Sequence, residues 1–224
     1  IQSSSATTVM LVGLVNSGLM SFQSSIGVIF GANIGTTITA WFLSLVGVES
    51  SSFLIQMVKP QNFAPILAII GIAFMMMSKN DKKKIIGTIF VGFTVLIYGM
   101  DIMSDSVAGL SESPAFADIL LKFNNPLFGI LIGAVVTAVI QSSSASVGIL
   151  QALSLTGAIS YNMAFPIILG QNIGTCATGL VSCIGAGTGA KRVATCHTLT
   201  NVIGTLILMP LFLVANNFLD GYFD

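Results

Sequence analysis

The chain has 224 residues, of which 54% are hydrophobic and only 7% are charged, with eight basic residues balancing eight acidic ones. A soluble domain usually carries about a quarter charged residues, so this composition indicates an integral membrane protein. A net charge of zero gives no electrostatic basis for binding nucleic acid, and three cysteines without a CxxC spacing argue against a disulfide framework or a zinc site.

Two short polar motifs occur twice in this hydrophobic sequence. The pentapeptide QSSSA stands at residues 2–6 and again at 141–145. The motif GxNIGT begins 29 residues after the Gln of each QSSSA, at residues 31 and 170. Sliding residues 1–39 onto 140–178, an offset of 139, gives 17 identities in 39 positions without a gap. The sequence therefore contains a duplicated unit.

The first copy is predicted to occupy residues 1–78. It starts at QSSSA with an apolar stretch that runs to residue 15, and a second stretch over residues 24–47 is interrupted by GANIGT. Residues 63–77 form an uncharged run that could cross a bilayer. By comparison with the second copy, this repeat lacks its N-terminal helix and the first arm of its hairpin.

The second copy is predicted to occupy residues 79–217, with a C-terminal tail after it over 218–224. After a spanning run that starts at Ile85, residues 128–155 form a hydrophobic stretch with QSSS in its middle, which indicates a re-entrant hairpin with QSSS at the tip. Residues 163–184 are about one span long, and GQNIGT predicts a break inside that helix. A last span over 193–214 closes the unit.

Charge and crossing number together predict that the two copies are inverted. Each unit crosses three times, and an odd number of crossings reverses the second unit in the membrane. The same count places Lys82–Lys84 and Lys191–Arg192 on one side and residues 104–125 on the other, and the positive-inside rule makes the lysine side cytoplasmic. We therefore expect an all-α integral membrane protein of the plasma (cell inner) membrane, multi-pass, with two inverted-topology repeats, each with a re-entrant hairpin and a broken transmembrane helix.

The polar breaks predict a site for an anion and a cation. Helix starts after QSSS and GxN present free N–H groups and partial positive charge, which can cradle an anion without Lys or Arg. The breaks contain no carboxylate or histidine, which proton coupling usually needs, so sodium is the expected coupling ion. Neutral oxygens for a hard cation come from Gln141, Ser142, Thr175 and Thr178 in the second copy and from Gln2, Ser3, Thr36 and Thr39 in the first.

The paired QSSS and GxNIGT motifs, with Cys196-His197 and Asn201, resemble the type II sodium/phosphate cotransporter family and its bacterial relatives. The resemblance implies sodium-coupled symport of inorganic phosphate by alternating access, with no enzymatic activity and no cofactor besides the coupling ion. It implies that the two sets of oxygen ligands above are sodium-site positions. It also implies phosphate binding by Ser3, Ser4, Ser5, Asn33, Ser142, Ser143, Ser144 and Asn172.

The same residues also allow other functions to be considered. A sodium-coupled transporter of another oxyanion is the nearest alternative, because helix dipoles recognise charge and shape more than identity. A passive anion channel is a second, and an intramembrane hydrolase using His197 is disfavoured because no GxSxG surrounds the serines. His197 and Asn201 are predicted to form interhelical hydrogen bonds. The expected partners are phosphate, sodium and the lipid bilayer, and a homodimer is compatible with this arrangement.

Overall fold

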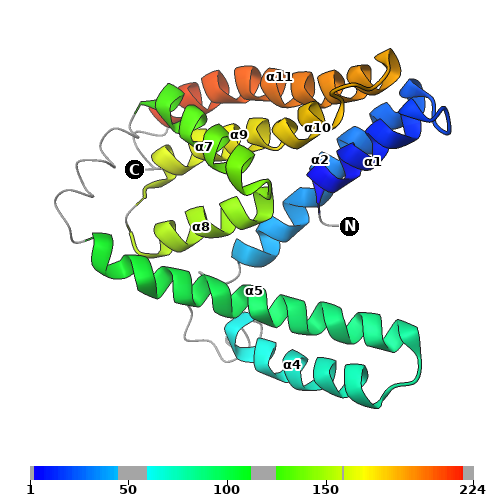
Figure 1. The fold of residues 1–224 in the computed structure, drawn as a ribbon. Helices are drawn as coiled ribbons and strands as arrows, with labels where there is room; N and C mark the ends of the chain where they lie inside the picture. The colour runs from blue at the N-terminus through cyan, green and yellow to red at the C-terminus, as the bar shows by residue number, and fades with distance from the viewer. Residues whose placement is uncertain (1–2, 45–59, 112–124, 158, 219–224) are drawn as a thin grey trace.

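The structure, a computed structural model, describes residues 3–44, 60–111, 125–157 and 159–218, and all regular elements in these ranges are helices (Figure 1). An all-α fold is therefore confirmed for the described part of the chain. The helices are α1 (Ser4–Asn16), α2 (Phe22–Ser44), α4 (Pro60–Met77), α5 (Asp81–Ser111), α7 (Pro126–Ile140), α8 (Ser143–Leu155), α9 (Tyr161–Gly174), α10 (Cys176–Ser182) and α11 (Thr188–Phe218).

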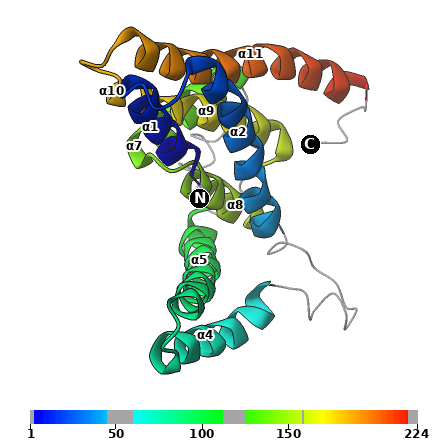
Figure 2. The same cartoon turned by 90° about the vertical axis from the view of Figure 1, so that its right-hand side faces the viewer.

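The helices form a main body and a projecting hairpin. Figures 1 and 2 show α11 running along one side of a body built from α1, α2 and α7–α10, while α4 and α5 form an antiparallel hairpin that stands away from it. The hairpin joins the body through α8, where Val147 packs against the buried pair Ala64 and Ile97. Within the hairpin, the Thr94 hydroxyl donates a hydrogen bond of 2.9 Å to the Ala64 carbonyl.

The two copies of QSSS fold in the same way. Ser3 and Ser142 both adopt extended backbone angles, and their side chains accept hydrogen bonds from the amides of Ala6 and Ala145, so each serine is the N-cap of a 13-residue helix. Before the second helix, Gln141 ends α7 in the left-handed conformation with φ of 58°. The second QSSS therefore ends α7 and starts α8, and the first QSSS starts α1.

The two copies of GxNIGT fold differently, and the predicted break in the first copy is wrong. α2 continues through GANIGT without interruption, whereas α9 ends at Gly174 and α10 begins at Cys176. In the second copy Gly174 is pressed against the Ala134 carbonyl of α7, but nothing lies within 4 Å of a Cβ at Gly35 in α2. One glycine lowers the stability of a helix by only about 1 kcal/mol relative to alanine. Without a packed neighbour, the apolar helix α2 therefore stays regular.

Glycines allow a close contact between α7 and α9. A Cβ at Gly133 of α7 would overlap the Ile167 carbonyl of α9, and a Cβ at Gly170 of α9 would overlap the Ile130 carbonyl of α7. The two backbones can approach this closely only because both positions lack a side chain, as in small-residue packing of membrane helices. The corresponding face of α2, with Gly27 and Gly31, meets no atom within 4 Å of an added Cβ.

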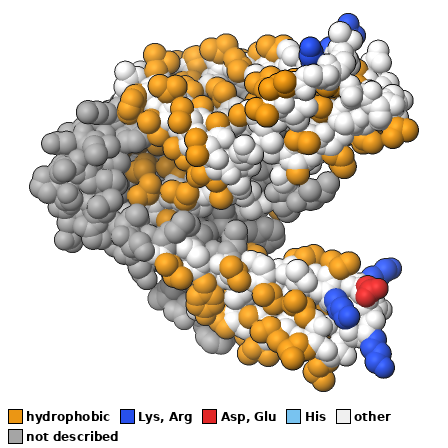
Figure 3. Space-filling view, in the orientation of Figure 1, with side chains coloured by type: hydrophobic (Ala, Val, Ile, Leu, Met, Phe, Trp, Pro, Cys, Tyr) orange, Lys and Arg blue, Asp and Glu red, His pale blue; other side chains and the backbone are white. Residues whose placement is uncertain are grey.

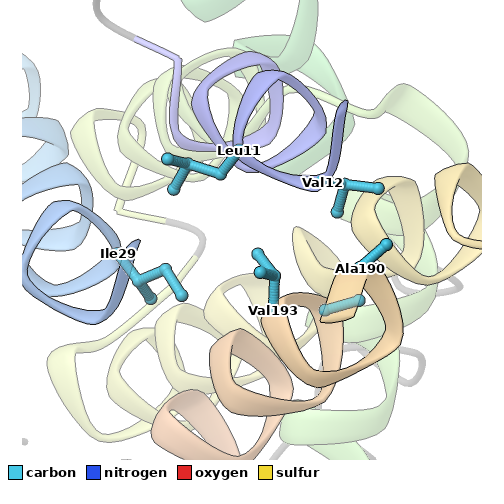
Figure 4. Close-up of a cluster of buried hydrophobic side chains, with 6 residues drawn as sticks. Leu11, Val12, Ile29, Ala190 and Val193 are labelled. Atoms are coloured by element: carbon cyan, nitrogen blue, oxygen red, sulfur yellow. The ribbon is translucent and has the colours of Figure 1, made fainter. Parts of the chain in front are cut away.

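A buried apolar cluster ties the first QSSS helix to α11. It contains Leu11 and Val12 of α1, Ile29 of α2, and Val193 with Ala190 and Ala194 of α11, all 4% exposed or less. Figure 4 shows the side chains of the three helices directed toward one another. The cluster places residues near the start of the chain against its last described helix, so α1 and α11 form one packing unit.

Two helices in the described ranges are long and apolar enough to cross a membrane. They are Tyr161–Ser182, which comprises α9 and α10, and Thr188–Phe218, which is α11. Four further apolar helices are shorter: Ser4–Asn16, Asn62–Met77, Pro126–Ile140 and Ser143–Leu155. The number of crossings per repeat therefore stays a prediction. The hairpin of α7 and α8 around QSSS has the form expected of a re-entrant element, and its membrane depth also stays a prediction.

The basic side chains of the described residues gather at one end. Figure 3 shows them at the tip of the α4–α5 hairpin and at the start of α11, while hydrophobic side chains cover much of the visible surface between. These segments carry Lys82–Lys84 and Lys191–Arg192. The arrangement agrees with the prediction that both basic groups share one side of the membrane.

The glycine contact can be tested with matched positions of the two copies. Gly170→Ala should lower the free energy of unfolding by about 2 kcal/mol or more, because the added methyl group overlaps the Ile130 backbone. Gly31→Ala, at the equivalent position of α2, should be neutral or stabilising because an exposed helix favours Ala over Gly. The check is unfolding of the 224-residue chain in detergent, and equal effects of the two changes would contradict the packing described.

Candidate functional site

A cavity of about 360 Å³ lies where the two copies meet. It is bounded by the starts of α1 and α8 and by the middle of α2, the end of α9 and one residue of α11. Nine of its thirteen lining residues have small polar side chains and four are apolar, and the polar ones come largely from QSSS and GxNIGT of both copies. The lining residues are Ser4, Asn33, Ile34, Thr36, Thr37, Ala40, Ser143, Ser144, Val147, Ile168, Asn172, Thr175 and Asn201.

Two helix starts converge on this cavity. Ser4 is the first residue of α1 and Ser143 is the first residue of α8, and both line it. Figure 1 shows α1 and α8 leaving this region in opposite directions, and α2 and the α9–α10 segment also run in opposite senses. The amide groups of a first helical turn have no intrahelical acceptor and carry partial positive charge. The two starts therefore direct positive potential into one space.

Hydroxyl groups around the cavity fall into two kinds. Those of Ser4, Ser143 and Ser144 form no hydrogen bond within the described part of the chain, so each remains able to donate a proton. Those of Thr36, Thr37 and Thr175 donate to backbone carbonyls of their own helices, at 2.9, 2.7 and 2.6 Å. The serines can thus bind an anion, whereas the threonine oxygens are left to accept a proton or coordinate a cation.

No charged side chain is among the residues that line this cavity. An anion held here would be stabilised by helix starts, hydroxyl groups and amides alone. Burial of an unpaired charge in a medium of low dielectric constant is costly, even where hydrogen bonds are available. Binding an anion at this site therefore favours the simultaneous binding of cations, for which the oxygen atoms of the threonines provide ligands.

A second cavity of about 320 Å³ lies between α1 and α2. Its polar groups come from Ser3, the N-cap of α1, from Thr7 of α1 and from Thr36 of α2, beside Gly31 and Gly35. The Thr7 hydroxyl donates to the Ser3 carbonyl at 2.8 Å, so its oxygen also retains free lone pairs. Thr36 lines both cavities, so the two spaces are neighbours across one side chain.

The structure brings five of the eight predicted phosphate residues together. Ser4, Asn33, Ser143, Ser144 and Asn172 all line the central cavity. The remaining three have other positions: Ser3 and Ser142 cap α1 and α8 with their side chains, and Ser5 is buried at 6% exposure without lining the cavity. The assignment of all eight to phosphate stays a prediction.

The predicted sodium residues are more dispersed. Thr36 and Thr175 line the central cavity, and Ser3 lines the second cavity with Thr36. Thr178 lines neither cavity, and its buried hydroxyl oxygen has no hydrogen-bond partner in the part of the chain that the structure describes. The others do not line either cavity or cannot be placed: Gln141 is exposed at the C-cap of α7, Ser142 caps α8, Thr39 lies elsewhere on α2, and Gln2 falls outside the described residues.

Asn201 is a cavity residue that the sequence did not assign to the site. Its Oδ1 accepts a hydrogen bond of 3.2 Å from Asn33 Nδ2, and its own Nδ2 donates to Cys176 Sγ at 3.1 Å. It therefore links α2 to α11 and fixes the amide of a predicted phosphate ligand. The available signal was its repetition, since Asn62 precedes it by the same offset of 139.

The predicted interhelical roles of His197 and Asn201 agree with these contacts. His197 is 1% exposed, and its Nδ1 lies 3.4 Å from the Thr8 hydroxyl of α1. Asn201 makes the bridge to α2 just described. One turn of α11 thus contacts both α1 and α2, which positions Ser4 and Asn33 on the cavity wall.

The model of the Na+/Pi-cotransporter family matches the chain twice, over residues 1–105 and 95–217, so that each match contains one QSSSA. The chain belongs to the Na+/Pi-cotransporter family. It is therefore a membrane transport protein, and the resemblance predicted from the paired motifs is confirmed.

Three relatives illustrate the breadth of the similarity. The uncharacterized protein YqeW of Bacillus subtilis is 32% identical over 221 residues, which are 98% of this chain and 67% of YqeW. Escherichia coli K12 YjbB, named as a candidate inorganic phosphate export protein, is 25% identical over 211 residues, 94% of this chain and 36% of YjbB. Rat sodium-dependent phosphate transport protein 2A is 33% identical over 133 residues, 55% of this chain and 21% of that protein.

The chain spans about two thirds of the Bacillus relative and little more than a third of YjbB. No solved structure matches the chain significantly. The family and its transport class therefore come from the sequence comparisons, and the arrangement of the site comes from the helices described above.

The Asn33–Asn201 bridge can be tested with a double-mutant cycle. Asn33→Ala and Asn201→Ala should each lower the free energy of unfolding. The loss in the double variant should be smaller than the sum of the two single losses by about 1 kcal/mol, the usual strength of one such hydrogen bond. The measurement is the free energy of unfolding of the four proteins in the same detergent. Additive losses would mean that the two amides do not interact.

Proposed function

We propose that this protein carries inorganic phosphate across the membrane together with sodium, by alternating access. The observation that carries the proposal is the central cavity, where neutral groups of both repeats converge on the starts of α1 and α8. Family membership supports phosphate as the substrate class. Coupling to sodium is argued from the electrostatics of that cavity and from the name of the rat relative.

Phosphate fits the donor arrangement. It offers several strong acceptor oxygens spread around one centre, and the cavity presents donors from opposite sides. Free hydroxyls of Ser4 on one side and of Ser143 and Ser144 on the other are joined by the amides of the two first helical turns. The side-chain amides of Asn33 and Asn172 complete the set. A tetrahedral oxyanion can satisfy these donors in several directions at once.

Sodium fits the acceptor arrangement. Thr36 and Thr175 have committed their hydroxyl protons to backbone carbonyls, so the sides of these oxygens that face the cavity offer lone pairs. A hard monovalent cation beside the anion offsets the charge that the lining does not neutralise. Because bound sodium lowers the electrostatic cost of phosphate, and phosphate that of sodium, each should raise the affinity for the other.

The relation between the two halves supports alternating access. The helices of the first copy run opposite to their counterparts in the second, as expected of inverted repeats that rock or slide around a fixed central site. Such a transporter can work in either direction, and the gradients of phosphate and sodium decide which. Export, suggested by the name of YjbB, is thus a second mode of the same site.

Uptake of labelled phosphate into proteoliposomes tests the function. An inward sodium gradient should drive saturable uptake that unlabelled phosphate inhibits, and replacement of sodium by potassium should remove it. Stronger inhibition by another oxyanion such as sulfate would assign a different substrate. Equal, unsaturable flux in both salts would contradict coupling and indicate a channel.

The anion site predicts a sharp effect of two single changes. Ser144→Ala and Asn172→Ala each remove one donor from the cavity and should reduce uptake at least tenfold, because loss of a hydrogen bond to a charged group costs roughly 1.5–3 kcal/mol. Ser154→Ala, on the exposed end of α8, is the control and should leave uptake unchanged. Normal uptake by both cavity variants would show that phosphate binds elsewhere.

The cation site predicts a selective effect at Thr175. Thr175→Val keeps the shape but removes the oxygen, so it should raise the sodium concentration for half-maximal uptake several-fold. Thr175→Ser restores an oxygen that can donate to the Asn172 carbonyl and should behave like the unchanged protein. The measurement is uptake as a function of sodium at fixed phosphate. An unaltered sodium dependence of Thr175→Val would remove Thr175 from the cation site.

A further inference from the structure

A groove of about 850 Å³ lies along the seam between α2 and α11, on the outside of the molecule. Its walls are mostly apolar, and large side chains stand partly exposed along it, among them Phe30, Leu199, Ile203 and Ile207. At one end it is lined by two cations, Lys191 and Arg192. This groove is separate from the central cavity, with which it shares no lining residue.

The charged end of the groove lacks a counter-ion. Lys191 and Arg192 are exposed in the early turns of α11, whose first turn contains no acidic residue, and neither forms an ion pair within the described part of the chain. The partial positive charge at the start of α11 adds to theirs. Three positive sources at one point favour an anion, and the planar guanidinium of an arginine suits a phosphate group.

The part of the groove from Arg192 to Ile203 matches the depth of one leaflet of a bilayer, and the lining continues about one turn further, to Ile207. Arg192 and Ile203 are eleven residues apart on α11, a rise of about 16 Å at 1.5 Å per residue. Half of the hydrocarbon core is roughly 15 Å. A phosphate group at Arg192 would therefore lie at the interface while an attached acyl chain reaches Ile203 near the middle of the membrane.

We propose that the groove between α2 and α11 binds an anionic phospholipid, with its phosphate at Lys191 and Arg192 and an acyl chain against Phe30, Leu199 and Ile203. Free phosphate would bind to the two cations but would not contact the apolar walls. A zwitterionic lipid would fill the walls and bring no net negative charge to the cations. An anionic lipid satisfies both ends of the groove.

The position of the groove gives this lipid a structural role. Phe30 lies one helical turn before Asn33, and Thr200, also in the lining, is next to Asn201. The groove is therefore the outer side of the seam that the Asn33–Asn201 hydrogen bond closes on the inside. A bound lipid would hold α2 against α11. Lipid binding itself does not depend on the proposed transport of phosphate.

The experiment is lipid binding to the purified chain by native mass spectrometry, with phosphatidylglycerol and phosphatidylcholine of identical acyl chains. The unchanged protein should bind phosphatidylglycerol about tenfold or more tightly than phosphatidylcholine, the effect expected of two basic residues on an anionic headgroup. The double variant Lys191→Gln/Arg192→Gln should lose this preference. Lys83→Gln/Lys84→Gln, which removes two exposed cations at the same end of the molecule, should keep it.

A second variant tests the apolar part. Gly204 belongs to the groove wall, and nothing lies within 4 Å of a Cβ added there. Gly204→Phe should therefore fill the groove without disturbing the fold, and it should weaken the binding of both lipids. The proposal fails if the two lipids bind equally or if the control pair at Lys83 and Lys84 matters as much. It also fails if inorganic phosphate displaces the lipid, or if the charge variant changes the oligomeric state and not lipid preference.

Discussion

The structure depends on one constraint: the amide groups at the start of a helix must find acceptors even where the surroundings are apolar. α1 and α8 start at the middle of the molecule, and both starts open into the same cavity. Ser3 and Ser142 satisfy one amide of each helix, at Ala6 and Ala145. The remaining donors are available to a ligand, and because no charged side chain lines the cavity, that ligand is held by helix starts, hydroxyls and amides together.

The surrounding helices keep these two starts in register. The α7–α9 glycine contact supports the second copy, where backbone carbonyls of one helix lie against glycines of the other. Among the described residues, α11 supports the first copy through the apolar cluster around Val193, the contact of His197 with Thr8, and the bridge from Asn201 to Asn33.

Much of this arrangement could be predicted from the sequence, because repetition is a signal that needs no knowledge of packing. The offset of 139 paired Ser4 with Ser143 and Asn33 with Asn172, and all four line the cavity. The error at GANIGT arose because a glycine motif does not break a helix by itself; only the copy pressed against α7 is interrupted, at Thr175. The role of Asn201 and the groove at Lys191 depend on contacts between distant segments, which no local pattern encodes.

The central claim is that a neutral cavity binds phosphate only when sodium neutralises it. The most direct measurement is equilibrium binding of labelled phosphate to the purified protein in sodium and in potassium at equal ionic strength. We expect saturable phosphate binding in sodium and at least tenfold weaker binding in potassium. The double variant Ser143→Ala/Ser144→Ala should lose phosphate binding in both salts. Phosphate binding of equal strength in the two salts would contradict the account.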